Sequence, residues 1–168
     1  MISSDEIRIS GVIEESIVDG LGIRYVIFTQ GCPHHCVGCH NPKTHDFAGG
    51  RLVPIEKLVS EIKSNPLIGG VTFSGGEPFC QPKPLSKLGA EIKKFGKNIW
   101  AFSGFTFEEI MNMGEDEREL LSLCDILVDG EFVLAEKSLC LKFRGSKNQR
   151  IVDVQKSLEA EKVVLADI

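Results

Sequence analysis

The chain has 168 residues, which is room for one compact domain. A complete eight-fold β/α barrel needs about 250 residues, so a full barrel is excluded, whereas a partial barrel of five to six βα units is not. With 42% hydrophobic and 26% charged residues the composition is that of a globular protein. The net charge of −5 disfavours binding to phosphate backbones. We therefore expect a single domain over residues 1–168 with no nucleic-acid partner.

The sequence offers no sign of a membrane or of export. No apolar stretch approaches the ~18 residues of a membrane span, and the first ten residues, MISSDEIRIS, lack both the basic and the apolar part of a signal peptide. We therefore expect a cytoplasmic protein with no membrane partner. In that compartment six cysteines are better interpreted as metal ligands, reactive thiols or small buried hydrophobes than as a disulfide framework.

The first elements in chain order are two strands, a long loop and a helix. Residues 7–14 and 22–29 read as strands, and the second is almost continuously apolar, as buried strands are. The loop over residues 30–51 is about 20 residues long and holds three cysteines and all four histidines, so it needs a functional reason. From Pro54 onwards, apolar residues recur at helical spacing.

Strands and helices then alternate through the rest of the chain. The predicted elements are a strand at 71–74, a helix at 85–95, a strand at 98–102, helical stretches at 106–113 and 117–123, and a strand at 125–129. This alternation predicts an α/β fold with a parallel sheet, either open or curved into part of a barrel. Functional residues are then expected at the carboxyl ends of the strands.

The strongest local motif is a cysteine triplet directly after the second strand. Cys32, Cys36 and Cys39 follow the spacing C-x3-C-x2-C. Three thiolates can hold three irons of a [4Fe–4S] cluster and leave the fourth iron open to an outside ligand. A closed zinc site is an equal alternative on these residues alone. Its fourth ligand would be one of the four nearby histidines, His34, His35, His40 or His45.

A second motif, SGGEP, begins at Ser74 and ends the next predicted strand. Two glycines let a ligand approach the backbone, and a carboxylate or carbonyl there can accept a hydrogen bond from an ammonium group. The alternative is an ordinary tight turn between a strand and a helix. Because the cysteine triplet is predicted at the same edge of the sheet, we favour a binding site for the polar end of an amino acid.

Together these motifs resemble a known superfamily. GCPHHCVGCHN followed by FSGGEP is similar to the radical S-adenosylmethionine superfamily, and DGLGIRYVIFTQGCPHHC resembles its activases of glycyl-radical enzymes. WAFSGF, DILVDGEF and FRGSKNQRIVDV resemble the activating proteins of anaerobic (class III) ribonucleotide reductases. The resemblance implies an α/β partial (β/α) barrel of radical S-adenosylmethionine type.

The resemblance also implies cofactors, a reaction and partners. Cys32, Cys36 and Cys39 would hold a [4Fe–4S] cluster whose fourth iron is chelated by S-adenosyl-L-methionine. Reductive cleavage would give a 5′-deoxyadenosyl radical that abstracts hydrogen from a glycine of the reductase's catalytic subunit. A low-potential donor such as flavodoxin or ferredoxin would supply the electron. The alternatives are an activase of another glycyl-radical enzyme such as pyruvate formate-lyase, or a non-catalytic zinc-binding module.

Residue roles follow from the same resemblance. Gly75, Gly76 and Glu77 match the stretch that contacts the methionine ammonium group, and Ser103 matches a contact beside the next strand end. Asp129 would help to hold the region of the methionine carboxylate. An aspartate that ends a strand is, however, more often a cap of a helix or turn.

The chain departs from the superfamily at Gly38, where many members have an aromatic residue before the third cysteine. Adenine must then be bound otherwise, and His40 or Asn41 are the candidates, with a solvated loop histidine as the alternative for His40. Asp19 and Arg24 are candidates for the side that meets the substrate loop. The alternative there is a glycine-rich turn before a strand.

For the remaining reactive or charged residues, packing or solvation is an alternative to a functional role. Cys124 is predicted to be a small buried hydrophobe, and Cys80 is either a packed thiol or a neighbour of the cofactor. Three basic residues of the tail could meet a nucleotide or a partner, or could solvate a turn: Arg144, Lys147 and Arg150.

Overall fold

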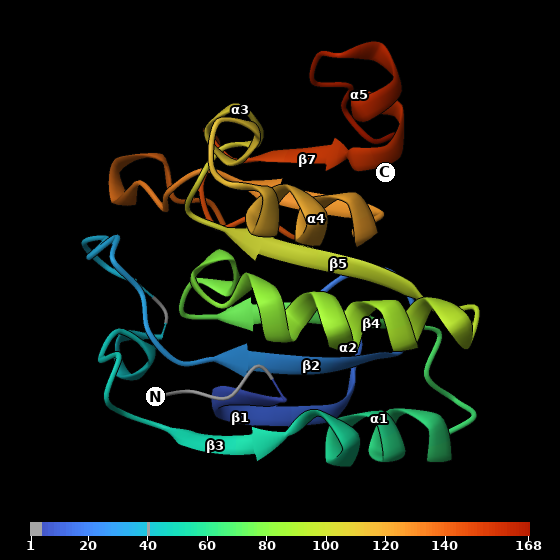
Figure 1. The fold of residues 1–168 in the computed structure, drawn as a ribbon. Helices are drawn as coiled ribbons and strands as arrows, with labels where there is room; N and C mark the ends of the chain where they lie inside the picture. The colour runs from blue at the N-terminus through green and yellow to red at the C-terminus, as the bar shows by residue number, and fades with distance from the viewer. Residues whose placement is uncertain (1–4, 40) are drawn as a thin grey trace.

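The computed structural model describes residues 5–39 and 41–168. Its described strands form one seven-stranded sheet in the order β3-β1-β2-β4-β5-β6-β7 (Figure 1). The strands are β1 (Glu6–Ser16), β2 (Arg24–Thr29), β3 (Arg51–Pro54), β4 (Gly70–Gly75), β5 (Asn98–Ser103), β6 (Ile126–Asp129) and β7 (Arg150–Asp153). Since β3 and β7 lie at opposite edges of this order, the sheet is open.

The centre of the sheet is parallel, as the βα alternation predicts. β2, β4, β5 and β6 are neighbours that run parallel, whereas β1, β3 and β7 are antiparallel to the strands beside them. The α/β class with an open, partial-barrel sheet is confirmed. The register pairs Thr29 with Gly75 and Ser103 with Asp129, so the carboxyl ends of the four parallel strands meet at one edge.

The described residues form five α-helices beside the strands: α1 (Ile55–Ser64), α2 (Pro82–Lys94), α3 (Phe107–Met111), α4 (Glu115–Leu123) and α5 (Val154–Ala160). Helices α1, α2 and α4 lie against one face of the sheet (Figure 1). Leu85, Leu88 and Ile92 of α2 recur at helical spacing and are completely buried in the apolar core on that face. None of the described helices has the length and apolarity needed to cross a membrane.

The other face of the sheet is covered by loops at its amino end. Arg24 is completely buried there, and its guanidinium group donates to the Thr72 hydroxyl (2.7 Å) and to the Val71 carbonyl (2.9 Å). It also lies over the ring of Trp100, which contacts Phe143 edge-on. Burial lowers the pKa of Arg24 to about 10, so it stays charged at neutral pH. Arg24 therefore links β2 to β4 and β5 on this face of the sheet.

Candidate functional site

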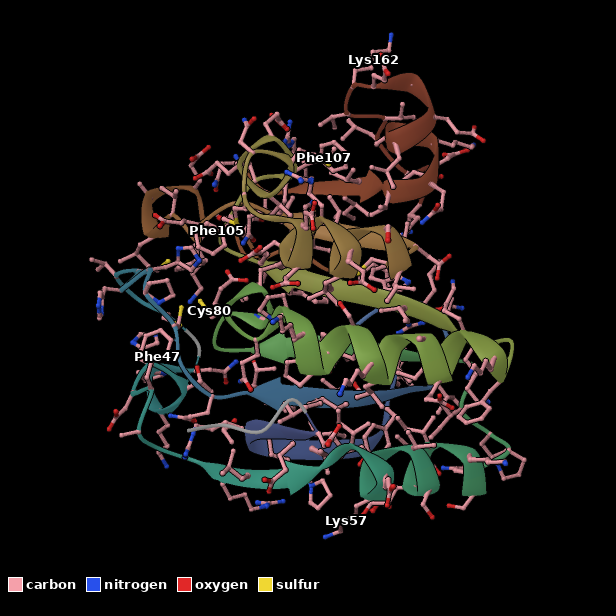
Figure 2. The ribbon with its side chains drawn as sticks, viewed as in Figure 1. Phe47, Lys57, Cys80, Phe105, Phe107 and Lys162 are labelled. Atoms are coloured by element: carbon pink, nitrogen blue, oxygen red, sulfur yellow. The ribbon has the colours of Figure 1, made fainter. Side chains whose placement is uncertain are left out.

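A pocket of about 690 Å³ lies at the carboxyl ends of the parallel strands. Side chains from all four parallel strands line it: Phe28, Ser74, Phe102 and Val128. They belong to the face that turns away from the helices. Figure 2 shows Phe47, Cys80 and Phe105 at this end of the sheet, and Lys162 far from it. The three cysteines of the triplet line the same pocket: Cys32, Cys36 and Cys39.

The described residues of the cysteine loop, 30–39 and 41–50, are held by hydrogen bonds within the loop. Gln30 is buried, and its amide donates to the carbonyls of Lys43 (2.9 Å) and Asp46 (2.7 Å). The backbone N–H of Cys32 donates to the carbonyl of His45 (3.1 Å). Gln30 therefore ties the far half of the loop to the end of β2, an arrangement that the sequence analysis missed.

Each thiol of the triplet accepts a backbone hydrogen bond. The N–H groups of His34 and Phe132 bond to the sulfurs of Cys32 and Cys36, and the Asn41 N–H lies 3.5 Å from Cys39 Sγ. Burial nevertheless raises the pKa of Cys32 to about 11 and also raises the pKa of Cys36. A bound metal deprotonates such thiols outright, because its charge stabilises the thiolate.

The donor set of the triplet suits a cluster. In the part of the chain that the structure describes, no three His, Cys, Asp or Glu side chains are grouped closely enough to hold a metal ion. In a [4Fe–4S] cluster each thiolate binds an iron of its own, so the three sulfurs need not converge on one ion. Hydrogen bonds from N–H groups to the sulfurs are a known means of adjusting such a cluster.

Gly75 and Gly76 line the pocket, but their lack of a side chain is required by the protein itself. Gly75 has a φ of +93°, and a Cβ there would lie 2.5 Å from the Thr29 nitrogen. A Cβ on Gly76 would lie 2.8 Å from the Thr44 carbonyl oxygen and closer still to that of Gly31. The glycines therefore allow the turn after β4 to pack on the cysteine loop, rather than only admitting a ligand.

Glu77, which follows these glycines, is completely buried and fully hydrogen-bonded. Its carboxylate lies 2.8 and 2.9 Å from the Ser103 hydroxyl and accepts from the N–H groups of Gly104 (2.8 Å) and Phe79 (3.1 Å). Nε2 of His34 lies 2.6 Å from the same carboxylate. The side chains of Glu77 and Ser103 thus bind each other, and Ser103 also lines the pocket.

His34 is a further residue of the site that the sequence suggested only as a zinc ligand. Its Nδ1 lies 3.0 Å from Glu131, so a carboxylate faces each ring nitrogen. Burial alone would lower the pKa of His34, but the hydrogen bonds and charges of Glu77 and Glu131 outweigh it and raise that pKa. A Cβ on Gly104 would lie 2.6 Å from His34 Nε2, and Phe105 contacts the ring edge-on.

Asp129 lies beside the main pocket rather than in it. Its carboxylate accepts from the Phe107 N–H (2.7 Å) at the start of α3 and from Arg150 Nε (3.0 Å). It lines a neighbouring pocket of about 410 Å³. This is the capping arrangement that the sequence analysis gave as the alternative.

Asp19 and Arg24 are joined through Thr72, whose hydroxyl accepts from Arg24 Nε (2.7 Å) and donates to the Asp19 carbonyl (2.8 Å). Asp19 lines the main pocket, where its carboxylate accepts from the Ser16 hydroxyl (2.5 Å). Arg24, the first residue of β2, is completely buried and is not among the described residues that line the pocket. Of the two adenine candidates, Asn41 lines the pocket and His40 lies outside the described residues.

The 131–149 segment, between β6 and β7, covers one side of the pocket. Seven of its residues line the pocket: Phe132, Leu139, Leu141, Phe143, Arg144, Gly145 and Gln149. Arg144 donates from Nη1 to the Gln149 carbonyl (3.1 Å). Among the described residues, Arg144 Nε and His45 Nε2 are buried without a hydrogen-bond partner, and both side chains line the pocket. Unpartnered buried donors and acceptors indicate a place for a polar ligand.

The other basic residues and cysteines lie elsewhere. Arg150 pairs with Asp129 and Glu108, and Lys147 is exposed. Cys124 is completely buried and bonds the Leu120 carbonyl, which confirms its predicted role as a small buried hydrophobe. Cys80 is exposed and is not among the described residues that line the pocket.

Comparisons with known proteins point to one family. The model of the 4Fe-4S single cluster domain matches residues 18–152. The anaerobic ribonucleoside-triphosphate reductase-activating protein of Haemophilus influenzae is 31% identical over 143 residues, covering 80% of this chain and 90% of that protein. The protein of the same name from Enterobacteria phage T4 is 36% identical, with 80% and 86% covered. The one from Escherichia coli K12 is 32% identical, with 79% and 90% covered.

A solved structure shows a weaker likeness. The crystal structure of QueE from Escherichia coli superposes with a TM-score of 0.48 at 15% sequence identity, covering 74% of this chain and 71% of that one.

Proposed function

Because the chain belongs to the family of anaerobic ribonucleoside-triphosphate reductase-activating proteins, we propose that it is an oxidoreductase that installs a glycyl radical in an anaerobic ribonucleotide reductase. Its cofactors are a [4Fe–4S] cluster and S-adenosyl-L-methionine. One observation carries the proposal: the three cysteines and the Gly75–Gly76 turn, which are far apart in the sequence, line one pocket.

Cys32, Cys36 and Cys39 would hold three irons, and their backbone N–H donors stabilise the thiolate charge. When bound, the cofactors supply the radical chemistry: one electron from a low-potential donor breaks a carbon–sulfur bond of S-adenosylmethionine, and the resulting 5′-deoxyadenosyl radical takes a hydrogen atom from a glycine of the partner. The protein's part is to hold the reacting groups in place and to limit the access of water.

Backbone atoms of the turn after β4 are proposed to bind the methionine ammonium group. The Glu77 carboxylate already accepts from Ser103, Gly104 and His34, so we assign it the role of holding this turn. The carbonyls of Gly75 and Gly76 are the proposed acceptors. Asp129 would act indirectly, through Arg150 and the start of α3.

Adenine is proposed to meet Asn41 and the 131–149 segment, with His40 retained as a prediction from the sequence. A Cβ on Gly38 would lie 3.4 Å from the ring of Phe132 and 3.0 Å from Leu134. The ring of Phe132 therefore lies beside Gly38, the position before the third cysteine where this chain lacks an aromatic residue. An aromatic face suits a nucleobase, because the two π-systems stack.

The partner's glycine is proposed to enter from the loop side of the pocket, past Val18 and Leu139. These side chains line the pocket and are 72% and 92% exposed. Asp19, which follows Val18 and also lines the pocket, is a candidate for contact with the entering loop. We further propose that residues 1–168 act as one domain, because one sheet contains every described strand.

Flavodoxin or ferredoxin is the proposed electron donor, at the outer surface of the cysteine loop. Val37 and Phe47 of that loop are 73% and 55% exposed, which offers an apolar contact next to the cluster ligands. Free thiols and a reducible cluster suit a reducing compartment, so we place the reaction in the cytoplasm.

Anaerobic purification followed by iron, sulfide and zinc analysis tests the proposal, together with single-turnover cleavage of S-adenosylmethionine. We expect a brown, iron-loaded protein that releases methionine and 5′-deoxyadenosine only when it is reduced. A colourless protein with one zinc and no cleavage would contradict the proposal.

A further inference from the structure

The 131–149 segment meets the cysteine loop at two consecutive residues. The carboxylate of Glu131 lies 3.0 Å from His34 Nδ1. The next residue, Phe132, donates its backbone N–H to the sulfur of Cys36. Since the two residues are adjacent, the position of the Glu131 side chain constrains the direction of the Phe132 N–H.

His34 is itself held firmly, so it is a fixed point for Glu131. Its side chain is only 8% exposed, and its other ring nitrogen lies 2.6 Å from the buried Glu77. Phe105 packs edge-on against the ring. By contrast, 54% of the Glu131 side chain is exposed, so this contact joins a surface segment to a rigid part of the site.

The segment also approaches the cysteine loop at Gly38. Leu134 and Phe132 approach Gly38, and Asn148 donates to the Glu131 carbonyl (2.8 Å) within the segment. Its regular structure in the described residues is a short 3₁₀ turn, Leu134–Glu136, and an isolated antiparallel bridge between Lys137 and Ser146. Side-chain contacts of Glu131 therefore matter more here than they would on a strand or a helix.

We propose that Glu131 is a positioning residue for the cluster: through His34 it holds the Phe132 N–H on the Cys36 thiolate and thereby sets the reduction potential. This inference rests on the proposed cluster at Cys32, Cys36 and Cys39. Hydrogen bonds to cluster sulfurs stabilise the more negative, reduced form. Loss of the Phe132 hydrogen bond makes the potential more negative and the cluster harder to reduce.

Charge and geometry at Glu131 can be separated by substitution. Glu131→Asp keeps the charge but shortens the reach by one methylene. Glu131→Gln removes the charge but keeps an oxygen that accepts from His34 Nδ1. Glu131→Ala removes both. The matched control is Glu136→Asp on the same segment, because Glu136 accepts from the Lys147 N–H through its backbone carbonyl.

The test is a redox titration of the cluster-loaded protein without S-adenosylmethionine, followed by electron paramagnetic resonance of the reduced cluster. We expect the reduction potential of the cluster to be more negative in Glu131→Asp than in the parent. It should also be more negative in Glu131→Ala than in Glu131→Gln. The control Glu136→Asp should have the same potential as the parent. If Glu131→Asp has the same reduction potential as the parent, and Glu131→Ala has the same potential as Glu131→Gln, the inference is wrong.

Hydrogen exchange provides a second, independent readout. In the loaded protein the amides of residues 131–138 should exchange faster in Glu131→Asp than in Glu136→Asp, whereas equal rates would contradict the inference. If the parent itself shows no redox-active cluster, the proposed function fails as well. A redox-active parent with unaffected Glu131 variants overturns only the role of Glu131.

Discussion

The carboxylate of Glu77 lies 2.6 Å from Nε2 of His34, and this contact joins the turn after β4 to the cysteine loop after β2. The two residues come from the two motifs that the sequence analysis predicts at the same edge of the sheet. Because Glu77 is completely buried and also binds Ser103, the two motifs share one hydrogen-bond network.

Replacing Glu77 with Gln should destabilise the protein and weaken S-adenosylmethionine binding. The amide would turn one acceptor oxygen into a donor facing the N–H donors of this site, at a cost of about 1–3 kcal/mol. Urea unfolding gives the change in stability, and equilibrium binding to the loaded protein gives the affinity. Glu91→Gln on α2, whose partner Lys94 is exposed, is the control. Equal stability of the two variants would contradict the network.

Gly76→Val should lower the iron content as well as the affinity for S-adenosylmethionine. From the sequence alone we would expect iron to be retained, because the glycine was assigned to ligand approach. In the structure a Cβ at this position collides with the backbone of Gly31 and Thr44, so the cysteine loop must shift. Iron and sulfide per chain are the measurement. Gly11→Ala, whose Cβ would have no atom within 4 Å, should load fully.

The cysteines should divide into two groups. Cys32→Ala, Cys36→Ala and Cys39→Ala should each abolish the cluster, because each removes one of three thiolates around the pocket. Cys124→Ala should keep the iron and lose about 1 kcal/mol of stability, since it removes a buried sulfur far from the site. Iron loss in Cys124→Ala as complete as in Cys36→Ala would refute the three-ligand assignment.

Stability should depend on pH through Glu108. Its hydrogen bond with Arg150 lowers the pKa of Glu108, so its contribution is present above the unfolded pKa of about 4.3 and is lost as the pH falls through the folded value. Because the Glu108 side chain is 58% exposed, Glu108→Gln should cost only about 0–1 kcal/mol at pH 7. Denaturant unfolding of the parent and of Glu108→Gln at pH 7 and at pH 3 should show a smaller difference in the free energy of unfolding at pH 3. A difference that grows in acid would contradict the assignment.

The sequence predicts the periodic elements well, because they depend on local spacing. The cluster ligands remain a prediction from the spacing of the cysteine triplet. The helix beginning after Pro54 and the strand before the cysteine triplet are confirmed. The short edge strand β3 was not predicted: the loop was expected to reach Arg51 and the helix to begin at Pro54, since four residues that pair with β1 leave no periodic pattern.

Contacts between distant residues could not be predicted. His34 and Glu131 are 97 residues apart, and only the fold brings them together. Arg24 illustrates the same limit. Its motif suggested a substrate loop, but the side chain is buried against Thr72 and Trp100 from other strands. A charged residue next to glycines gives no local sign of such burial.

Electron paramagnetic resonance of two reaction mixtures tests the central claim most directly. The reduced protein with S-adenosylmethionine is incubated with the anaerobic ribonucleotide reductase, and separately with pyruvate formate-lyase, both from the same organism. The account predicts a glycyl-radical signal in the reductase and little or none in the lyase. A glycyl signal in the lyase alone would contradict the assignment of the partner, and no glycyl signal in either mixture would contradict the proposed activity.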